Sequence, residues 1–190
     1  RSSATAEDLP NASFAGQQET YLNIVGLKAL VDAMQKVYAS LYTDRAIAYR
    51  VHQKFDHSDV SISVGFQRMV RSDKSTSGVM FTLDTESGSE DIIFINASYG
   101  LGETIVQGSV NPDEFYVFKE AVSNGKFPII RKNLGEKSEK MIFAKGRKAE
   151  ASVKTIKVSK SDQGRFSLTD KEIINLSKSA MIIEKHYKKP

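Results

Sequence analysis

Residues 1–20 contain the residue types that could bind a polyphosphate. Arg1 leads into a run of small residues, RSSATAEDLPNASFAGQQET, which includes Gly16 and ends at Thr20. Small residues let backbone N–H groups approach phosphate oxygens closely, and an arginine adds a bidentate charged contact. The Thr20 hydroxyl adds one more hydrogen-bonding group. Composition alone, however, favours an ordinary surface loop rich in Ser and Ala.

Two later segments could complete a nucleotide site. Gln67, Met69 and Val70 follow an alternating strand, where backbone groups could meet an adenine edge and apolar side chains its faces. Glu103 follows two glycines in YGLGETIVQ (99–107), where a carboxylate could bind ribose hydroxyls or magnesium. The plainer alternatives are a buried strand end and an acid that interacts with a helix dipole. The order of the three segments is more informative than any one alone.

The histidines do not predict a metal site or a phosphate acceptor. His57, close to Asp56 and Asp59, is interpreted as a surface residue, and His186 as a cation near a helix C-terminus. The sequence has no G-x-x-x-x-G-K-[ST], G-x-G-x-x-G, H-E-x-x-H or G-x-S-x-G motif, and it has no cysteine. We therefore assign no metal ligand.

Helices are predicted where apolar residues recur every three or four positions. The stretch 26–42 has this spacing, and Asp44 is expected to cap a second helix that ends near Lys54. Thr169, with Glu172 three residues later, predicts a capping box at the start of a C-terminal helix.

Strands are predicted by alternation at 60–66 and, after a polar loop at 71–78, by further apolar runs. The later strands are expected at 79–81, 92–95, 114–119, 128–131, 140–144 and 153–158. The polar turn at 85–90 suggests that the first two of these form an antiparallel pair. Because strands and helices are segregated rather than strictly alternating, the sequence favours an α+β fold.

The charge of the chain is unevenly distributed. Residues 1–118 carry a net charge of −6 and residues 119–190 a net charge of +10, which together give +4. A basic tail can bind nucleic acid, but a solvated lysine-rich surface is favoured because few aromatic residues are interleaved. No apolar run approaches the roughly 20 residues of a membrane helix. Without cysteines or a signal peptide, the protein is expected to be cytoplasmic.

The stretch RSSATAEDLPNASFAGQQETYLN (1–23) closely resembles the ATP-binding domain shared by phosphoenolpyruvate synthases, pyruvate phosphate dikinases and rifampicin phosphotransferases. The stretches most similar to phosphoenolpyruvate synthases are TDRAIAYRVHQKFDH (43–57), SVGFQRMVRSDKSTSGVMFTLDTESG (63–88), ASYGLGETIVQGSVNPDEFYVF (97–118) and SLTDKEIINLSKSAMIIEKHYKKP (167–190). Rifampicin phosphotransferases usually have a sequence closer to F-T-A-N-P where this chain has F-T-L-D-T (81–85). Residues 119–165 resemble the family least and are expected to be a variable basic insertion.

The resemblance implies that residues 1–190 are part of one ATP-grasp domain, with an antiparallel sheet and flanking helices. It implies that Arg1 contacts the triphosphate and acts in catalysis, and that Gly16 and Thr20 belong to a loop that closes over the phosphates. By the same resemblance, the residues that read adenine or lie near the nucleotide are Gln67, Met69, Val70 and Glu103.

The implied activity is that of a pyruvate, water dikinase, in which ATP, pyruvate and water give AMP, phosphoenolpyruvate and phosphate through a phosphohistidine on a separate domain. The chain opens within a motif at Arg1 and stops after a helix at Pro190, so we expect a domain truncated at both ends. The family's phosphate-binding lysine would precede Arg1. Its magnesium ligands and its phosphohistidine and pyruvate-binding domains would follow Pro190. The isolated fragment is expected to bind ATP weakly and to catalyse nothing.

Alternative functions differ in substrate or in class. A rifampicin phosphotransferase or a pyruvate phosphate dikinase would keep the same ATP-binding domain. A basic module that binds nucleic acid through residues 119–190 belongs to another class. The leading interpretation predicts ATP and Mg²⁺ as ligands, with no nucleic-acid or membrane partner, and it is compatible with an oligomeric full-length enzyme.

Overall fold

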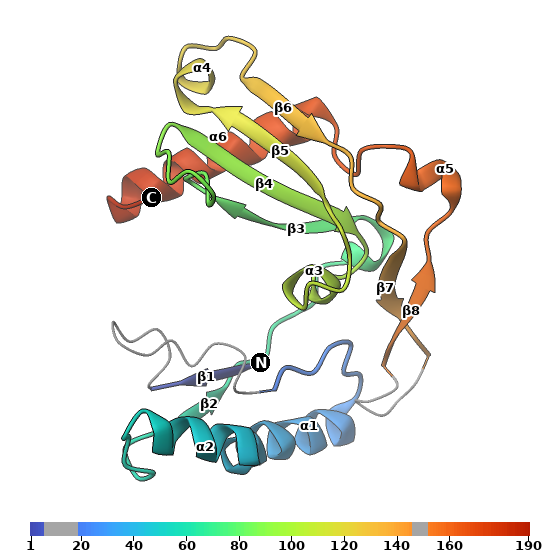
Figure 1. The fold of residues 1–190 in the computed structure, drawn as a ribbon. Coiled ribbons are helices and arrows are strands. Elements are labelled where there is room, and N and C mark those ends of the chain that lie inside the picture. The colour runs from blue at the N-terminus through green and yellow to red at the C-terminus, as the bar shows by residue number, and fades with distance from the viewer. Residues whose placement is uncertain (6–18, 146–151) are drawn as a thin grey trace. The chain divides into compact units, whose positions relative to one another are not determined.

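The computed structural model describes residues 1–5, 19–145 and 152–190. The chain divides into two compact units: residues 1–70 with 143–153, and residues 71–142 with 154–190. The first unit combines helices with a short strand pair, and the second is built on a four-stranded sheet (Figure 1). The predicted α+β class is confirmed.

The helices of the first unit follow the predicted apolar spacing. They are α1 (Leu27–Ala39), the 3₁₀ turn η1 (Ser40–Tyr42) and α2 (Asp44–His52). The prediction that Asp44 caps α2 is wrong. Thr43 is the N-cap, because it has the extended backbone that a cap requires and its hydroxyl accepts a hydrogen bond from the Ala46 N–H at 3.3 Å.

The strand predicted at 60–66 is shorter in the structure. It forms β2 (Ile62–Val64), which pairs antiparallel with β1 (Ser2–Ala4), and only three residues are available on each side. Val60 is buried beside Leu41, whereas Phe66 leaves the pair and is 58% exposed. The end of β2 therefore runs into an open segment rather than a buried one.

The sheet of the second unit is entirely antiparallel. Its strands, in spatial order, are β3 (Thr76–Phe81), β4 (Ile92–Tyr99), β5 (Asp113–Phe118) and β6 (Ile129–Asn133). The predicted antiparallel pair is confirmed. It is longer than predicted, because residues 76–78 of the expected polar loop belong to β3. Gly78 permits this close pairing, since a Cβ there would lie 2.0 Å from the Asn96 carbonyl oxygen.

One face of the sheet forms the core of the second unit. Helix α6 (Asp170–Tyr187) lies along this face (Figure 1). The buried residues of this core are Ile93, Ile95, Ala97, Phe115, Val117, Ile173 and Ala180. The predicted capping box of α6 is confirmed, with reciprocal hydrogen bonds between Thr169 and Glu172.

Several shorter helices and strands lie outside the four-stranded sheet. They are η2 (Ser72–Lys74), α3 (Glu103–Val106), α4 (Lys119–Ser123), β7 (Glu139–Phe143), β8 (Val153–Lys157) and α5 (Lys160–Gln163). Strands β6, β7 and β8 lie close to their predicted positions. Helices α4 and α5 were not predicted, because four or five residues are too few to show a helical period.

Candidate functional site

Arg1 is fixed at the end of the β1–β2 pair. Its backbone nitrogen donates to the Gly65 carbonyl oxygen at 3.0 Å, and its own carbonyl oxygen accepts from the Gly65 N–H at 2.8 Å. Its side chain is exposed, and its Nε donates to the Ser2 carbonyl oxygen at 3.3 Å. The strand pair therefore places Arg1 beside the residue that precedes the segment 66–70.

The segment 66–70 contains Gln67, Met69 and Val70 and has no regular secondary structure. Within the part of the chain that the structure describes, its backbone N–H and carbonyl groups form no hydrogen bond. Gln67 is exposed, Val70 is 81% exposed, and Met69 is half-buried. A segment with unpaired backbone groups can offer donors and acceptors to a planar ligand, as the edge strand of a sheet does.

The predicted phosphate loop lies largely outside the described residues, and Gly16 is among the residues that are not described. Thr20 is described and exposed, without regular structure. Three residues later, the Asn23 N–H donates to the Met69 sulfur at 2.8 Å. The structure thus brings the chain after Thr20 together with Met69, and sequence reasoning had not singled out Asn23.

Glu103 is the first residue of α3, the position of an acid that interacts with a helix dipole, and it belongs to the second unit. It is half-buried, and its Oε1 accepts a hydrogen bond from Gln107 Nε2 at 2.8 Å. The other described candidates, Arg1, Thr20 and the residues of the segment 66–70, belong to the first unit.

The glycine loop before Glu103 is held by neighbouring strands. Gly100 has a left-handed backbone with a φ of 86°, and a Cβ there would lie 2.5 Å from the Met141 carbonyl oxygen. That same oxygen accepts a hydrogen bond from the Leu101 N–H at 2.9 Å. Burial, followed by the charge of Asp162, raises the pKa of Tyr99 at the start of this loop. The loop therefore has a defined position from which α3 begins.

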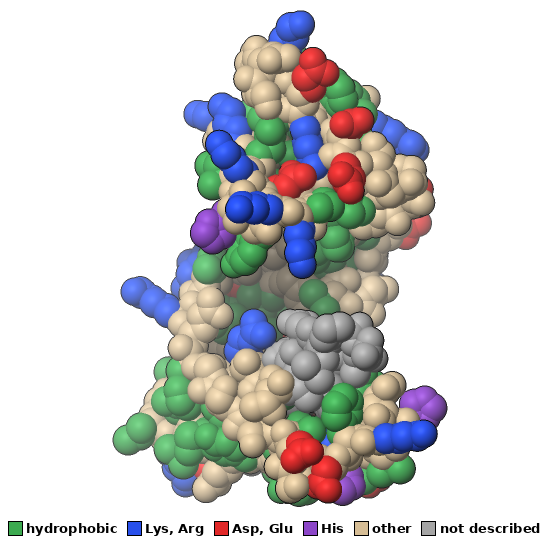
Figure 2. All heavy atoms as spheres, turned by 90° about the vertical axis from the view of Figure 1, so that its left-hand side faces the viewer, with side chains coloured by type: hydrophobic (Ala, Val, Ile, Leu, Met, Phe, Trp, Pro, Cys, Tyr) green, Lys and Arg blue, Asp and Glu red, His purple; other side chains and the backbone are tan. Residues whose placement is uncertain are grey.

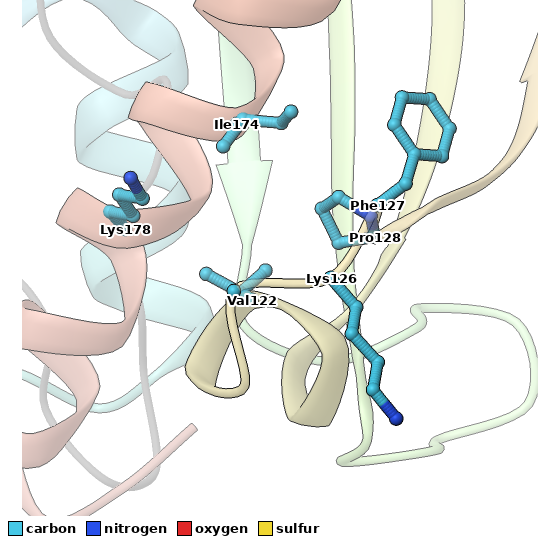
Figure 3. Close-up of a pocket in the computed structure, with 7 residues that line it drawn as sticks. Val122, Lys126, Phe127, Pro128, Ile174 and Lys178 are labelled. Carbon is cyan, nitrogen blue, oxygen red and sulfur yellow. The ribbon is translucent and has the colours of Figure 1, made fainter.

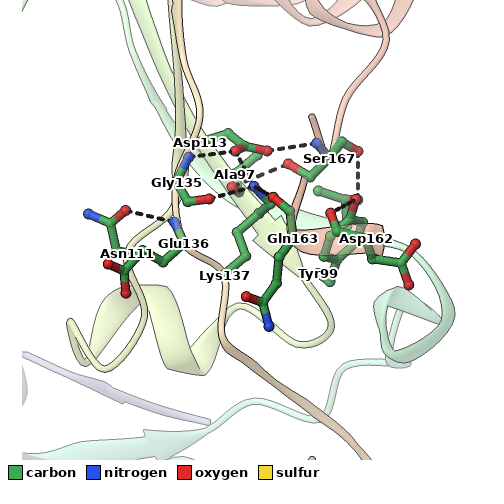
Figure 4. Close-up of polar contacts among 11 residues, drawn as sticks. Ala97, Tyr99, Asn111, Asp113, Gly135, Glu136, Lys137, Asp162, Gln163 and Ser167 are labelled. Carbon is green, nitrogen blue, oxygen red and sulfur yellow. Dashed lines mark hydrogen bonds and ion pairs between the residues drawn. The ribbon is translucent and has the colours of Figure 1, made fainter. Parts of the chain in front are cut away.

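Sequence reasoning missed a buried ion pair in the second unit (Figure 4). Lys137 Nζ lies 2.5 Å from Asp113 Oδ1, and both side chains are fully buried. The ammonium group also donates to the carbonyl oxygens of Gly135 and Gln163, at 2.8 and 3.3 Å. The carboxylate accepts from the backbone N–H groups of Gly135 and Ser167, at 2.9 and 2.7 Å.

This pair joins three parts of the second unit: the start of β5, the residues before β7 and the residues between α5 and α6. The lysines of residues 119–190 were predicted to form a solvated surface, but the Lys137 side chain is fully buried. On the face seen in Figure 2, other basic side chains of this unit are interspersed with acidic ones.

The described residues contain no group of three or more His, Asp or Glu side chains that could hold a metal ion. His57 instead accepts a hydrogen bond at Nδ1 from Nε of the buried Arg50, at 2.9 Å. His186 lies in the last turn of α6, as predicted. Among the described residues, no helix is both long and apolar enough to cross a bilayer.

A surface hollow of about 300 Å³ lies between α6 and the connection from α4 to β6 (Figure 3). Apolar residues form most of it, and Lys126 and Lys178 lie at its margin, with Lys126 extending away. It contains none of the predicted nucleotide-binding residues, so it does not support their assignment.

The whole chain, residues 1–190, matches the family model described as the pyruvate phosphate dikinase AMP/ATP-binding domain. The chain belongs to this family. It is 61% identical over its full length to the phosphoenolpyruvate synthase of Pseudomonas aeruginosa, 60% to that of Neisseria meningitidis and 52% to that of Escherichia coli. The chain spans 24% of each of these three relatives. The predicted family is thereby confirmed, and nothing in these relatives supports the nucleic-acid alternative.

Proposed function

We propose that this chain is the ATP-binding part of a phosphoenolpyruvate synthase. The complete enzyme would convert ATP, pyruvate and water into AMP, phosphoenolpyruvate and phosphate through a phosphohistidine on another domain. The observation that carries the proposal is an identity of 52–61% to three phosphoenolpyruvate synthases over every residue of this chain. We further propose that the domain has the ATP-grasp fold and acts in the cytoplasm.

The geometry of the first unit supports a nucleotide that spans Arg1 and the segment 66–70. Arg1 is paired with Gly65, the residue immediately before this segment. A guanidinium group is a strong donor to phosphate oxygens, and unpaired backbone groups can recognise the edge of a base. In this proposal, Arg1 binds the triphosphate and stabilises the charge that develops on it during transfer. Gln67, Met69 and Val70 bind the adenine.

Three further residues complete the proposed site. Gly16 and Thr20 would contribute backbone and hydroxyl donors to the phosphates, and Glu103 would lie close to the nucleotide. Such a site contributes by positioning and charge neutralisation, because phosphoryl transfer needs no protein nucleophile beside ATP.

Magnesium would neutralise the charge of the phosphates when it is bound. The described residues do not form a carboxylate cluster that fits this ion. Glu103 has one carboxylate, which already accepts a hydrogen bond from Gln107. We therefore assign no magnesium ligand among the described residues.

The proposal is tested by identifying the products that the full-length protein forms from ATP, Mg²⁺ and pyruvate with ³¹P NMR. AMP, phosphate and phosphoenolpyruvate in equal amounts are expected. A requirement for added orthophosphate would indicate a pyruvate phosphate dikinase, and AMP formation only with rifampicin would indicate the antibiotic phosphotransferase. If ATP is not consumed with any of these acceptors, the proposed activity is wrong.

A further inference from the structure

Three segments that are distant in sequence meet at Asn23. Its N–H donates to the sulfur of Met69, at an N···S distance of 2.8 Å. Its side-chain Nδ2 donates to the carbonyl oxygens of Ser152 and Ala144, at 2.6 and 3.3 Å. All four residues belong to the first unit. Asn23 therefore connects Met69 to the end of β7 and the start of β8.

A second set of hydrogen bonds closes this arrangement. The Ser152 hydroxyl donates to the carbonyl oxygen of Leu22 at 2.7 Å, and the Ala144 N–H donates to that of Ser152 at 2.8 Å. Ser152 is only 2% exposed. Because hydrogen bonds that are partly shielded from water cost more to lose than exposed ones, these contacts fix the position of Asn23 more strongly than surface contacts would.

The backbone and the side chain of this residue both favour asparagine. Asn23 has a φ of 50°, in the left-handed region that asparagine and glycine adopt more readily than other residues. Its amide also supplies the two donors that the carbonyl oxygens of Ala144 and Ser152 require. Glycine would keep the backbone conformation but lose both side-chain contacts. Aspartate would place a carboxylate against two carbonyl oxygens.

The position of Met69 matters because it lies in the segment 66–70, whose backbone groups form no hydrogen bond within the described residues. A methionine side chain has three rotatable bonds and is mobile unless it is held. The contact from Asn23 holds its sulfur. We infer that Asn23 is a positioning residue for adenine recognition: it fixes the Met69 side chain beside the backbone groups that bind the base. The inference rests on the proposed ATP-binding function.

The test is isothermal titration calorimetry on the full-length protein with two ligands, ATP and inorganic tripolyphosphate. Tripolyphosphate carries the charge of the triphosphate but has no base. In Asn23→Gly the side-chain hydrogen bonds that hold the Asn23 N–H against the Met69 sulfur are lost, so the affinity for ATP should fall about tenfold, while the affinity for tripolyphosphate stays within about twofold. An equal loss for both ligands would indicate a purely structural role and overturn the inference. So would an unchanged affinity for ATP.

A matched control is Lys54→Gly. Lys54 is exposed, lies in the same unit and has a φ of 59°, so this variant places glycine at another left-handed position without touching the Asn23 contacts. It should leave both affinities unchanged.

If Asn23→Gly does not fold, Met69→Leu provides the second test, because it removes the acceptor sulfur while nearly conserving volume. Met69→Leu should also lower the affinity for ATP and leave the affinity for tripolyphosphate unchanged. An affinity for ATP equal to that of the wild type would overturn the inference. If the wild-type protein does not bind ATP, whether or not it binds tripolyphosphate, the proposed function itself is refuted.

Discussion

Replacing Lys137 with methionine should destabilise the second unit strongly. Methionine has a similar length but no charge, so the variant leaves the Asp113 carboxylate fully buried without its counterion. Removing one partner of a buried ion pair typically costs about 3–5 kcal/mol. The carboxylate would keep its hydrogen bonds from the backbone N–H groups of Gly135 and Ser167. We therefore expect about 3 kcal/mol, the lower end of that range.

The measurement is thermal unfolding of wild type and variant by differential scanning calorimetry. For a domain of this size, 1 kcal/mol corresponds to a shift of about 2–4 °C, so the expected decrease is about 6–12 °C. Lys126→Met is the matched control, because Lys126 is exposed in the same unit, and it should shift the transition by no more than about 2 °C.

The double variant Lys137→Met with Asp113→Asn separates the pair energy from simple loss of packing. It removes both charges, so its destabilisation should be smaller than the sum of the two single effects by about 1–3 kcal/mol. A Lys137→Met transition within about 2 °C of wild type would refute the reasoning, since a buried charge would then have lost its counterion at no measurable cost.

Further predictions concern backbone fit, capping and pH. Gly135→Ala should lower the melting temperature markedly, because a Cβ there would lie 2.2 Å from a backbone oxygen. Gly164→Ala, with its nearest contact at 3.7 Å, should change it little. Thr169→Ala should destabilise α6 by about 1 kcal/mol in chemical denaturation, and unchanged stability would refute the role of the capping box. Hydrogen bonds from the Thr169 N–H and hydroxyl lower the pKa of Glu172. The stability that these bonds add is therefore present above the ordinary value of 4.5 and lost as the pH falls below it. Melting curves of wild type and Glu172→Gln should converge in acid. Burial raises the pKa of Tyr99, so stability should fall as the pH rises above 10, and Tyr99→Phe should remove that part of the decrease.

The elements that the sequence predicted well have strong local signals. The apolar spacing of α1, the capping box at Thr169 and the apolar runs of β3 and β4 each depend on residues within one element or one turn. The errors lie at the ends of elements, where neighbouring residues compete to determine the residue at which a helix or strand begins or ends. Thr43 rather than Asp44 caps α2, and β2 stops where its three-residue partner stops.

The polar contacts could not be predicted because they join distant residues. Lys137 lies in the polar sequence LGEKSEK, typical of a surface loop, yet its partner Asp113 is 24 residues away and both are buried. Asn23 contacts residues 46 and 129 positions away. The assignments of Arg1 and Glu103 derive from the family resemblance, and they stay predictions until ligand binding is measured.

The most direct test of the account is calorimetric titration of ATP into the full-length protein and its Arg1→Met variant. The account predicts saturable binding of one ATP by the wild type. It also predicts an affinity at least about tenfold lower in the variant, because a charge-assisted contact to phosphate is lost. Adenosine, which has no phosphate, should bind both proteins equally. The absence of saturable ATP binding, or equal affinity of the two proteins for ATP, would contradict the account.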